Sequence, residues 1–88
     1  MKLPSGLEVT LKSMSYDEAL AHLEAEGQPA KKGGRAFHEF RMQTLEKLYG
    51  PEVAKKVKAA NSDVVVLYRA TIDATWPKEG KETEEKNS

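Results

Sequence analysis

Histidine and cysteine, which often carry acid–base or metal chemistry, are scarce in this sequence. Its 88 residues include two histidines, His22 and His38, and no cysteine. Neither histidine stands four residues from another histidine, and no carboxylate cluster completes a set of metal ligands around either. The lack of cysteine excludes disulfides, thiolate metal sites and cysteine nucleophiles. The sequence therefore predicts no catalytic, cofactor or metal residue, and we expect a protein that is not an enzyme.

Two further groups of residues have suitable chemistry but lack the spacing that a site requires. Turn and helix-capping positions account for the serines Ser5, Ser13, Ser15 and Ser62, none of which lies in a nucleophile-elbow pattern. Residues 31–35, Lys-Lys-Gly-Gly-Arg, have the composition of a phosphate-binding loop. A P-loop follows a buried strand and ends in Gly-Lys-Ser/Thr, whereas this segment follows a helical pattern. We therefore expect a mobile loop over residues 28–35, whose position would allow it to become ordered on a partner.

Composition and charge narrow the class of protein further. The 14 basic and 14 acidic residues give a net charge of +0, which argues against binding to nucleic acid or to a membrane surface through general charge attraction. The longest apolar run, residues 64–68, is too short to span a bilayer. The N-terminus lacks the apolar core of a signal peptide. We expect one small cytoplasmic domain over residues 1–76, with a tendency to self-associate because its net charge is low.

The N-terminal residues have the pattern of a β-hairpin. The turn at residues 3–6 has Pro4 at its second position and Gly6 at its end. Residues 7–12 then alternate between apolar and polar side chains, as a half-buried strand does. We expect this strand to pair with residues 1–3, and the hairpin to need cover from the helices because two strands alone are marginally stable.

Helical patterns follow. Ser15 with Glu18 is a capping-box pattern that begins a helix over residues 16–26, ended by the next glycine. One face of this helix is apolar and is expected to be buried: Tyr16, Ala19, Leu20 and Leu23. A second helix is predicted over residues 36–49. A Gly-Pro pair then suits a helix stop followed by a third helix over residues 51–60.

The segment 64–76 fits two structures. Its apolar residues alternate, which favours a strand, but they also share one helical face behind the capping residues Asn61, Ser62 and Asp63. Helix is preferred because a strand of that length would be long for so small a sheet. Residues 77–88 are polar throughout and are predicted to be disordered. The expected fold class is α+β and mostly helical: an N-terminal β-hairpin, three or four helices and a disordered C-terminal tail.

The large aromatic and aliphatic side chains of the second helix and of segment 64–76 are the candidate partner-binding residues. They are Phe37, Phe40, Tyr49, Leu67, Tyr68 and Trp76. Their simplest role is to form the core. Trp76 borders the polar tail, so its ring either closes the core or marks a contact surface.

The beginning of the chain also resembles a known family. The Leu-Pro-Ser-Gly turn at residues 3–6, the alternating residues 7–11 and the Met-Ser-Tyr-Asp-Glu run at residues 14–18 resemble the start of tail assembly chaperones of tailed bacteriophages. Residues 67–71 and the short polar tail also look like the corresponding segments of proteins in this family. The glycine-rich residues 31–35 depart from it. The resemblance implies a non-enzymatic assembly factor of the host cell cytoplasm that binds the tape measure protein and the tail tube subunits and is absent from the finished tail.

Many chaperones of this family are also made in a longer, frameshifted form, and Lys86-Asn87 is compatible with an A-rich slippery run in the gene. Two alternatives remain open. One is a structural head–tail joining or tail-completion protein, which would stay in the virion. The other is a small nucleic-acid-binding regulator that uses the basic side chains Lys31, Lys32, Arg35, Arg41 and those of residues 55–58.

Overall fold

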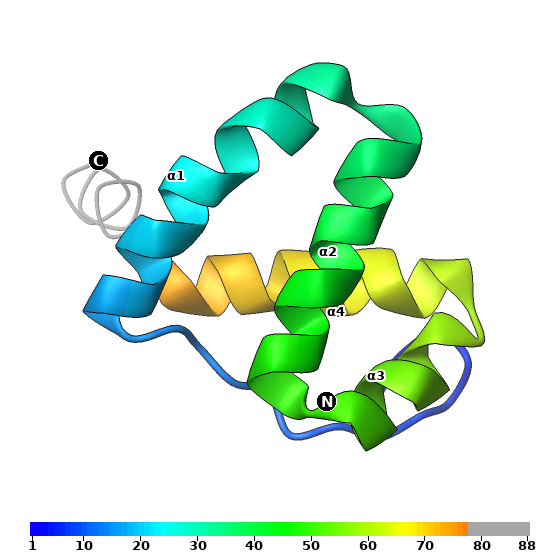
Figure 1. The fold of residues 1–88 in the computed structure, drawn as a ribbon. Coiled ribbons are helices and arrows are strands. Elements are labelled where there is room, and N and C mark those ends of the chain that lie inside the picture. Colours follow the sequence, from blue (N-terminus) through cyan, green and yellow to red (C-terminus); the bar gives the residue numbers. More distant parts are fainter. Residues whose placement is uncertain (78–88) are drawn as a thin grey trace, which may run out of the picture.

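The computed structural model describes residues 1–77, and residues 78–88, which hold nearly all of the predicted tail, lie outside the described residues. The described part contains four helices (Figure 1), namely α1 (Tyr16–Lys32), α2 (Gly34–Tyr49), α3 (Pro51–Lys58) and α4 (Asn61–Thr75). No helix in this part is long and apolar enough to cross a membrane. Because α4 spans Asn61–Thr75, the prediction that segment 64–76 is helical is confirmed.

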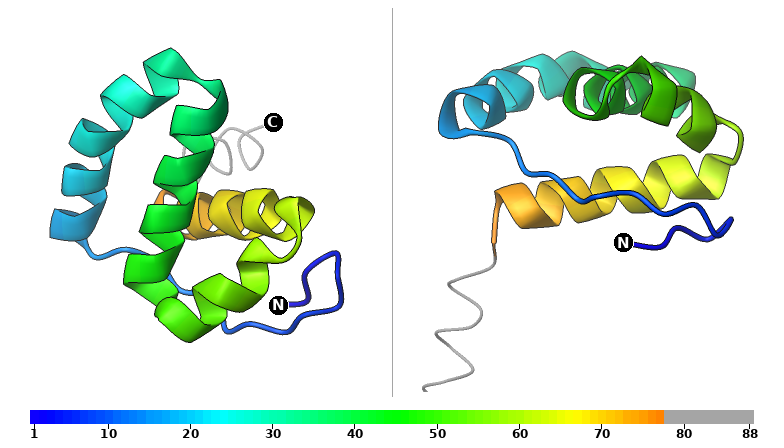
Figure 2. Two further views of the ribbon diagram at one scale, coloured as in Figure 1. Left: turned by 45° about the vertical axis from the view of Figure 1, so that its right-hand side comes forward. Right: turned by 90° about the horizontal axis from the view of Figure 1, so that it is seen from below.

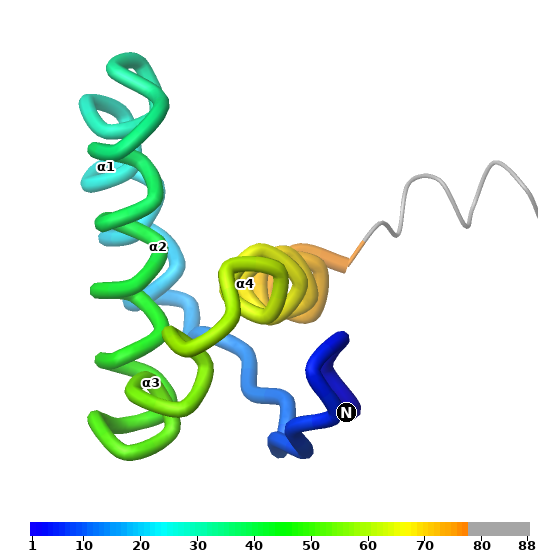
Figure 3. The backbone as a smooth tube through the Cα atoms, turned by 90° about the vertical axis from the view of Figure 1, so that its right-hand side faces the viewer, coloured from blue at the N-terminus to red at the C-terminus, as the bar shows by residue number. Residues whose placement is uncertain are grey.

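The helices form two layers. α1, α2 and α3 lie in one layer, and α4 crosses beneath them (Figure 2). α2 is central, because it packs against all three other helices. The N-terminal segment, residues 1–14, runs in the lower layer beside α4 (Figure 3). The first residues of the chain thus lie next to its last helix.

The hydrophobic core lies where α2, α3, α4 and the N-terminal segment meet. Its buried members come from all four parts: Leu3, Leu45, Tyr49, Val57, Val64, Leu67 and Tyr68. Each large apolar side chain that is fully buried contributes roughly 1.5–3 kcal/mol relative to its exposure to water. α1 contributes no residue to this cluster, so it is the helix that the core holds least directly.

The predicted N-terminal β-hairpin is wrong, and with it the α+β fold class, because the described residues contain helices and no strand. Residues 1–14 form a turn with a single isolated antiparallel bridge between Lys2 and Glu8. The turn itself is present: the Gly6 N–H donates to the Leu3 carbonyl over 2.8 Å, and Gly6 has a φ of 97°. That positive φ is one that glycine adopts readily.

Backbone pairing is limited to residues 1–3 and 7–9, where the Leu3 N–H donates to the Leu7 carbonyl and the Val9 N–H to the Met1 carbonyl. Further along the segment, backbone donors bond to side chains of the helices. The Tyr49 hydroxyl accepts from the Lys12 N–H over 2.9 Å. The Thr75 hydroxyl accepts from the Met14 N–H over 3.0 Å. The alternation of residues 7–12 therefore reflects an extended segment that packs Leu7 and Val9 against the core.

The predicted mobile loop over residues 28–35 is also wrong. α1 continues through Gly27 and Pro29 to Lys32, and Gly33 alone separates it from α2. Pro29 lies inside the helix near its end, and its carbonyl accepts from the Gly33 N–H over 2.9 Å. Gly33 has φ 65° and ψ −164°, a conformation that side chains strongly disfavour. Gly34 also has a positive φ, of 51°, so two adjacent glycines make the reversal between two long helices.

The other helix boundaries differ less from those predicted from the sequence. The capping box is confirmed, since Ser15 and Glu18 exchange both of its hydrogen bonds. α2 begins two residues earlier than predicted, and α3 ends at Lys58 rather than at residue 60. α4 has no side-chain cap, because its N-cap residue is Ala60. The predicted capping residues Asn61, Ser62 and Asp63 lie within its first turn, and the buried Asp63 accepts hydrogen bonds from Ser5.

The predicted apolar face of α1 is only partly buried. Of its four residues, only Ala19 is enclosed, and the helix buries His22 as well. Tyr16, Leu20 and Leu23 are 74%, 39% and 51% exposed. The helical period was therefore read correctly, but the rest of the described chain does not cover that face.

Candidate partner-binding site

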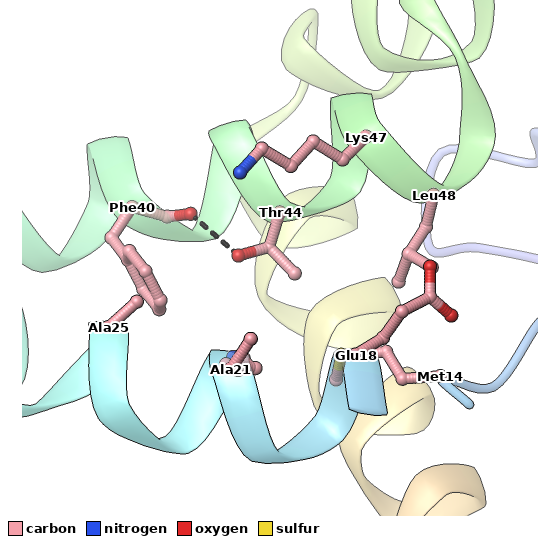
Figure 4. Close-up of a pocket in the computed structure, with 9 residues that line it drawn as sticks. Met14, Glu18, Ala21, Ala25, Phe40, Thr44, Lys47 and Leu48 are labelled. Atoms are coloured by element: carbon pink, nitrogen blue, oxygen red, sulfur yellow. Dashed lines mark hydrogen bonds between the residues drawn. The ribbon is translucent and has the colours of Figure 1, made fainter. Parts of the chain in front are cut away.

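A groove runs between α1 and α2 (Figure 4). Met14 and four residues of α1 form one wall, and four residues of α2 form the other: Glu18, Ala21, His22 and Ala25 face Phe40, Thr44, Lys47 and Leu48. Its volume is about 280 Å³. The groove exists because α1 places small side chains where α2 places large ones.

The walls of the groove are mainly carbon. Ala21 and Ala25 are exposed and one helical turn apart, so the wall that α1 forms carries only small side chains at these positions. Phe40, Thr44 and Leu48 follow the same spacing on α2. The Thr44 hydroxyl donates to the Phe40 carbonyl over 3.0 Å, which leaves its methyl group directed towards α1 (Figure 4). The exposed interior of the groove is therefore suited to apolar side chains.

One charge of each sign lies at the rim. Lys47 extends along the α2 wall, and Glu18 lies near Met14 and Leu48 (Figure 4). Hydrogen bonds from the Ser15 N–H and hydroxyl lower the pKa of Glu18, so it is ionised at neutral pH. These two charges can orient a bound segment without adding net charge to the groove.

His22, which lines the groove, belongs to a polar cluster with Tyr68 and Glu26. The Tyr68 hydroxyl donates to the Glu26 carboxylate over 2.9 Å and lies 2.9 Å from His22 Nε2. A hydroxyl has one proton to donate, so His22 Nε2 must carry the hydrogen and donate to Tyr68. The chain of donors runs from His22 through Tyr68 to Glu26 and joins α1 to α4.

Burial shifts the pKa values of this cluster in opposite directions. Burial lowers the pKa of His22, with Glu26 partly opposing the shift. Burial and the hydrogen bond to Glu26 raise the pKa of Tyr68 well above its ordinary value. Both groups are therefore neutral near pH 7, and the cluster holds α1 in place against α4.

An aromatic cluster borders the polar cluster. The Phe37 ring meets the Tyr68 ring edge-on at 6.1 Å, and the Phe40 ring lies 5.1 Å from the His22 ring. The Arg41 guanidinium is 4.3 Å from the Phe37 ring centroid and 5.7 Å from that of Tyr68. Such stacking is worth about 0.5–2 kcal/mol and keeps Arg41 against the protein surface.

The six predicted partner-binding residues occupy three places. Phe37, Phe40 and Tyr68 come together in the aromatic cluster, and Phe40 alone of the six lines the groove. Tyr49 and Leu67 are buried in the core. Trp76 follows α4 and is 39% exposed.

Sequence reasoning missed the two alanines that shape the groove, Ala21 and Ala25. The signal that could have found them is their spacing of four residues, on a helical face other than that of Leu20 and Leu23. The candidate residues were chosen for their large side chains, whereas this part of the groove is formed by small ones.

The basic residues of the nucleic-acid alternative do not form one surface. Lys31, Lys32 and Arg35 lie at the α1–α2 junction, whereas α3 carries Lys55, Lys56 and Lys58 at the other end of α2 (Figure 1). Arg35 pairs with Glu39 over 2.8 Å, and Arg41 is stacked on aromatic rings. This division weakens the case for a nucleic-acid interface.

Among residues 1–77, no group of three or more His, Asp or Glu side chains is placed to hold a metal ion. Comparison with known protein families, characterised proteins and solved structures finds no match to this chain. The groove between α1 and α2 is accordingly the feature on which a function can be argued.

Proposed function

We propose that this protein is a non-enzymatic phage morphogenesis factor, a tail assembly chaperone that binds apolar helical segments of the tape measure protein and of tail tube subunits in the host cytoplasm. The observation that carries the proposal is the apolar groove between α1 and α2. The resemblance of residues 3–18 to such chaperones directs it towards phage tails.

The size of the groove favours protein side chains over a small molecule. Its volume of about 280 Å³ is at or below the lower end of the ~300–1,000 Å³ typical of pockets for small ligands. A groove between two helices suits an amphipathic helix that inserts two or three apolar side chains. Ala21 and Ala25 allow the incoming backbone to approach α1, while Phe40 and Leu48 provide apolar contact.

A filled groove tests the proposal. The variant Ala25→Trp places a large ring in the groove at an exposed position, so the fold is retained while the space is lost. The matched control is Lys56→Trp, which adds the same ring to an exposed site on α3. Isothermal titration with tape measure segments from the same genome should show binding at least about tenfold weaker for A25W and unchanged for K56W. Equal affinities for the two variants would contradict the proposed groove.

Composition of the virion separates a chaperone from a structural component. Mass spectrometry of purified virions should find no stoichiometric amount of the chain if it acts only during assembly. Its presence in every virion would favour the head–tail joining or tail-completion alternative. The nucleic-acid alternative requires retention on DNA at low salt that falls steeply as salt is added.

A further inference from the structure

α1 carries a second apolar surface on a face that does not line the groove. Tyr16, Leu20, Leu23, Gly27 and Ala30 follow one another at spacings of four and three residues, the repeat of a coiled-coil seam. We call these five residues the α1 stripe. At 3.6 residues per turn they lie within about 80° of arc. All five are exposed, with Tyr16, Leu20 and Leu23 at 74%, 39% and 51%.

The stripe is separate from the surfaces that the protein already uses. Ala19 and His22, the buried residues of α1, occupy an adjacent arc of the helix. Ala21 and Ala25 face the groove from the other side. A partner on the stripe would therefore leave the groove open.

We propose that the α1 stripe binds the same stripe of a second copy of this chain, antiparallel, across a two-fold axis at Leu23. This arrangement is self-complementary in size. Tyr16 of one copy lies beside Ala30 of the other, and Leu20 lies beside Gly27, so that each large side chain meets a small one. Leu23 packs on its own symmetry mate.

The charges beside the stripe favour the antiparallel direction. Asp17, Glu24 and Lys31 flank it at intervals of seven residues, with the acidic end at the start of α1 and the basic end in its last turn. In a parallel two-fold pair, this flank of the two helices would lie at opposite edges of the interface, and these residues would not meet one another. An antiparallel pair places Asp17 opposite Lys31 twice, and only Glu24 meets its own mate. Opposed helix dipoles add to the same preference.

The interface is small, which sets the expected strength of association. A 17-residue helix is about 25 Å long at 1.5 Å per residue. One helix pair of this length buries less than the ~800 Å² per partner of a standard interface. We expect a dimer that dissociates on dilution through about the micromolar range. The net charge of +0 places no overall repulsion between the copies.

The first test is the mass of the protein in solution. Sedimentation equilibrium from about 1 to 300 µM should take the wild type from its monomer mass of 9.8 kDa towards twice that value. Leu23→Glu should remain monomeric at every concentration. Leu11→Glu is the matched control, because Leu11 is 40% exposed and lies outside α1, and it should dimerise like the wild type. A wild type that stays monomeric, or equal behaviour of L11E and L23E, overturns the proposal.

Charge exchange tests the direction of pairing without touching the apolar contact. Asp17→Lys and Lys31→Asp should each weaken the dimer by about 3- to 10-fold, because each places like charges opposite one another. The double variant D17K/K31D should restore the wild-type affinity. A double variant weaker than both single variants would overturn the antiparallel arrangement.

The absence of cysteine from the chain permits a direct test of proximity. Under oxidation by copper–phenanthroline, Leu23→Cys should form a disulfide-linked dimer, whereas the exposed control Lys56→Cys should not. Tyr16→Cys mixed with Ala30→Cys should crosslink far faster than either variant alone. Faster crosslinking of Y16C with itself would indicate parallel pairing and overturn the proposal.

Discussion

Asp63, near the start of α4, accepts two hydrogen bonds from Ser5 in the N-terminal turn, 58 residues earlier in the chain. The Ser5 N–H donates to Oδ1 over 3.0 Å, and the Ser5 hydroxyl donates to Oδ2. Asp63 is fully buried. A buried carboxylate needs such donors, so this pair fixes the turn against α4.

Loss of the Asp63 carboxylate should therefore destabilise the fold. We expect Asp63→Ala to lower the free energy of unfolding by about 3 kcal/mol, because it leaves the Ser5 donors without their charged acceptor. Urea unfolding followed by circular dichroism measures the change. Asp73→Ala, at an exposed position of the same helix, should stay within about 0.5 kcal/mol of wild type. Equal losses in the two variants would show that the Ser5 contact contributes nothing.

Stability should depend on pH through His22. Burial holds its pKa in the folded state below the ordinary value of 6.5. Between that lowered pKa and about 6.5, the unfolded chain binds more protons than the folded one. The free energy of unfolding should therefore fall as the pH falls through this window and level off below the folded pKa.

Chemical unfolding at several pH values between 5 and 8 checks this dependence. His22→Gln should remove the part of the slope that histidine contributes, while His38→Gln should retain it. An unchanged slope in H22Q would contradict a neutral, buried His22.

The Tyr68 hydroxyl should contribute to stability separately from its ring. Tyr68→Phe keeps the aromatic packing but removes the link between His22 and Glu26. We expect a loss of about 1–2 kcal/mol in the free energy of unfolding. Tyr16→Phe alters a hydroxyl on a ring that is 74% exposed, and it should have no measurable effect.

Gly27 within α1 and Gly33 at its C-terminal end should respond in opposite directions to alanine. Gly33→Ala forces a side chain into a positive-φ conformation, although no atom lies within 4 Å of the added Cβ. We expect a loss of about 1–2 kcal/mol from backbone strain alone. Gly27→Ala lies in helical backbone with open space around it, and it should stabilise the monomer by about 0.5–1 kcal/mol. Thermal unfolding at low protein concentration measures both.

The parts of the fold that the sequence predicts correctly depend on local interactions. The Ser15–Glu18 capping box and the Gly50–Pro51 boundary between α2 and α3 are each determined by neighbouring residues. Segment 64–76 is helical although it is rich in β-branched residues, and the Thr71 hydroxyl donates to the carbonyl of Leu67, four residues earlier. This interaction accommodates a β-branched residue within a helix.

The parts that it misses depend on contacts between distant residues. Alternation in residues 7–12 suggests a strand, but a strand also needs a partner, and Tyr49 takes the place of one. Asp63 is a residue type that often caps helices, yet α4 begins two residues before it, and Asp63 is buried with hydrogen bonds from Ser5. Pro29 is a residue that often ends a helix, but α1 continues past it to Lys32.

The candidate site was harder to foresee than the helices. Of the six residues predicted from their size, Phe40 alone lines the groove. The groove depends on how far apart α1 and α2 lie, and this distance follows from Gly33 and from the link between His22 and Tyr68. No local pattern in the sequence encodes the separation of two helices.

The contact between Ser5 and Asp63 can form only late in the synthesis of the chain, because Asp63 is added 58 residues after Ser5. At about 5–20 residues per second, a ribosome adds Asp63 roughly 3–12 s after Ser5. During that interval the N-terminal turn has no acceptor, and α2 lacks the helix that covers its aromatic side chains. Nascent chains on one message therefore expose these aromatic side chains to one another before α4 completes the fold.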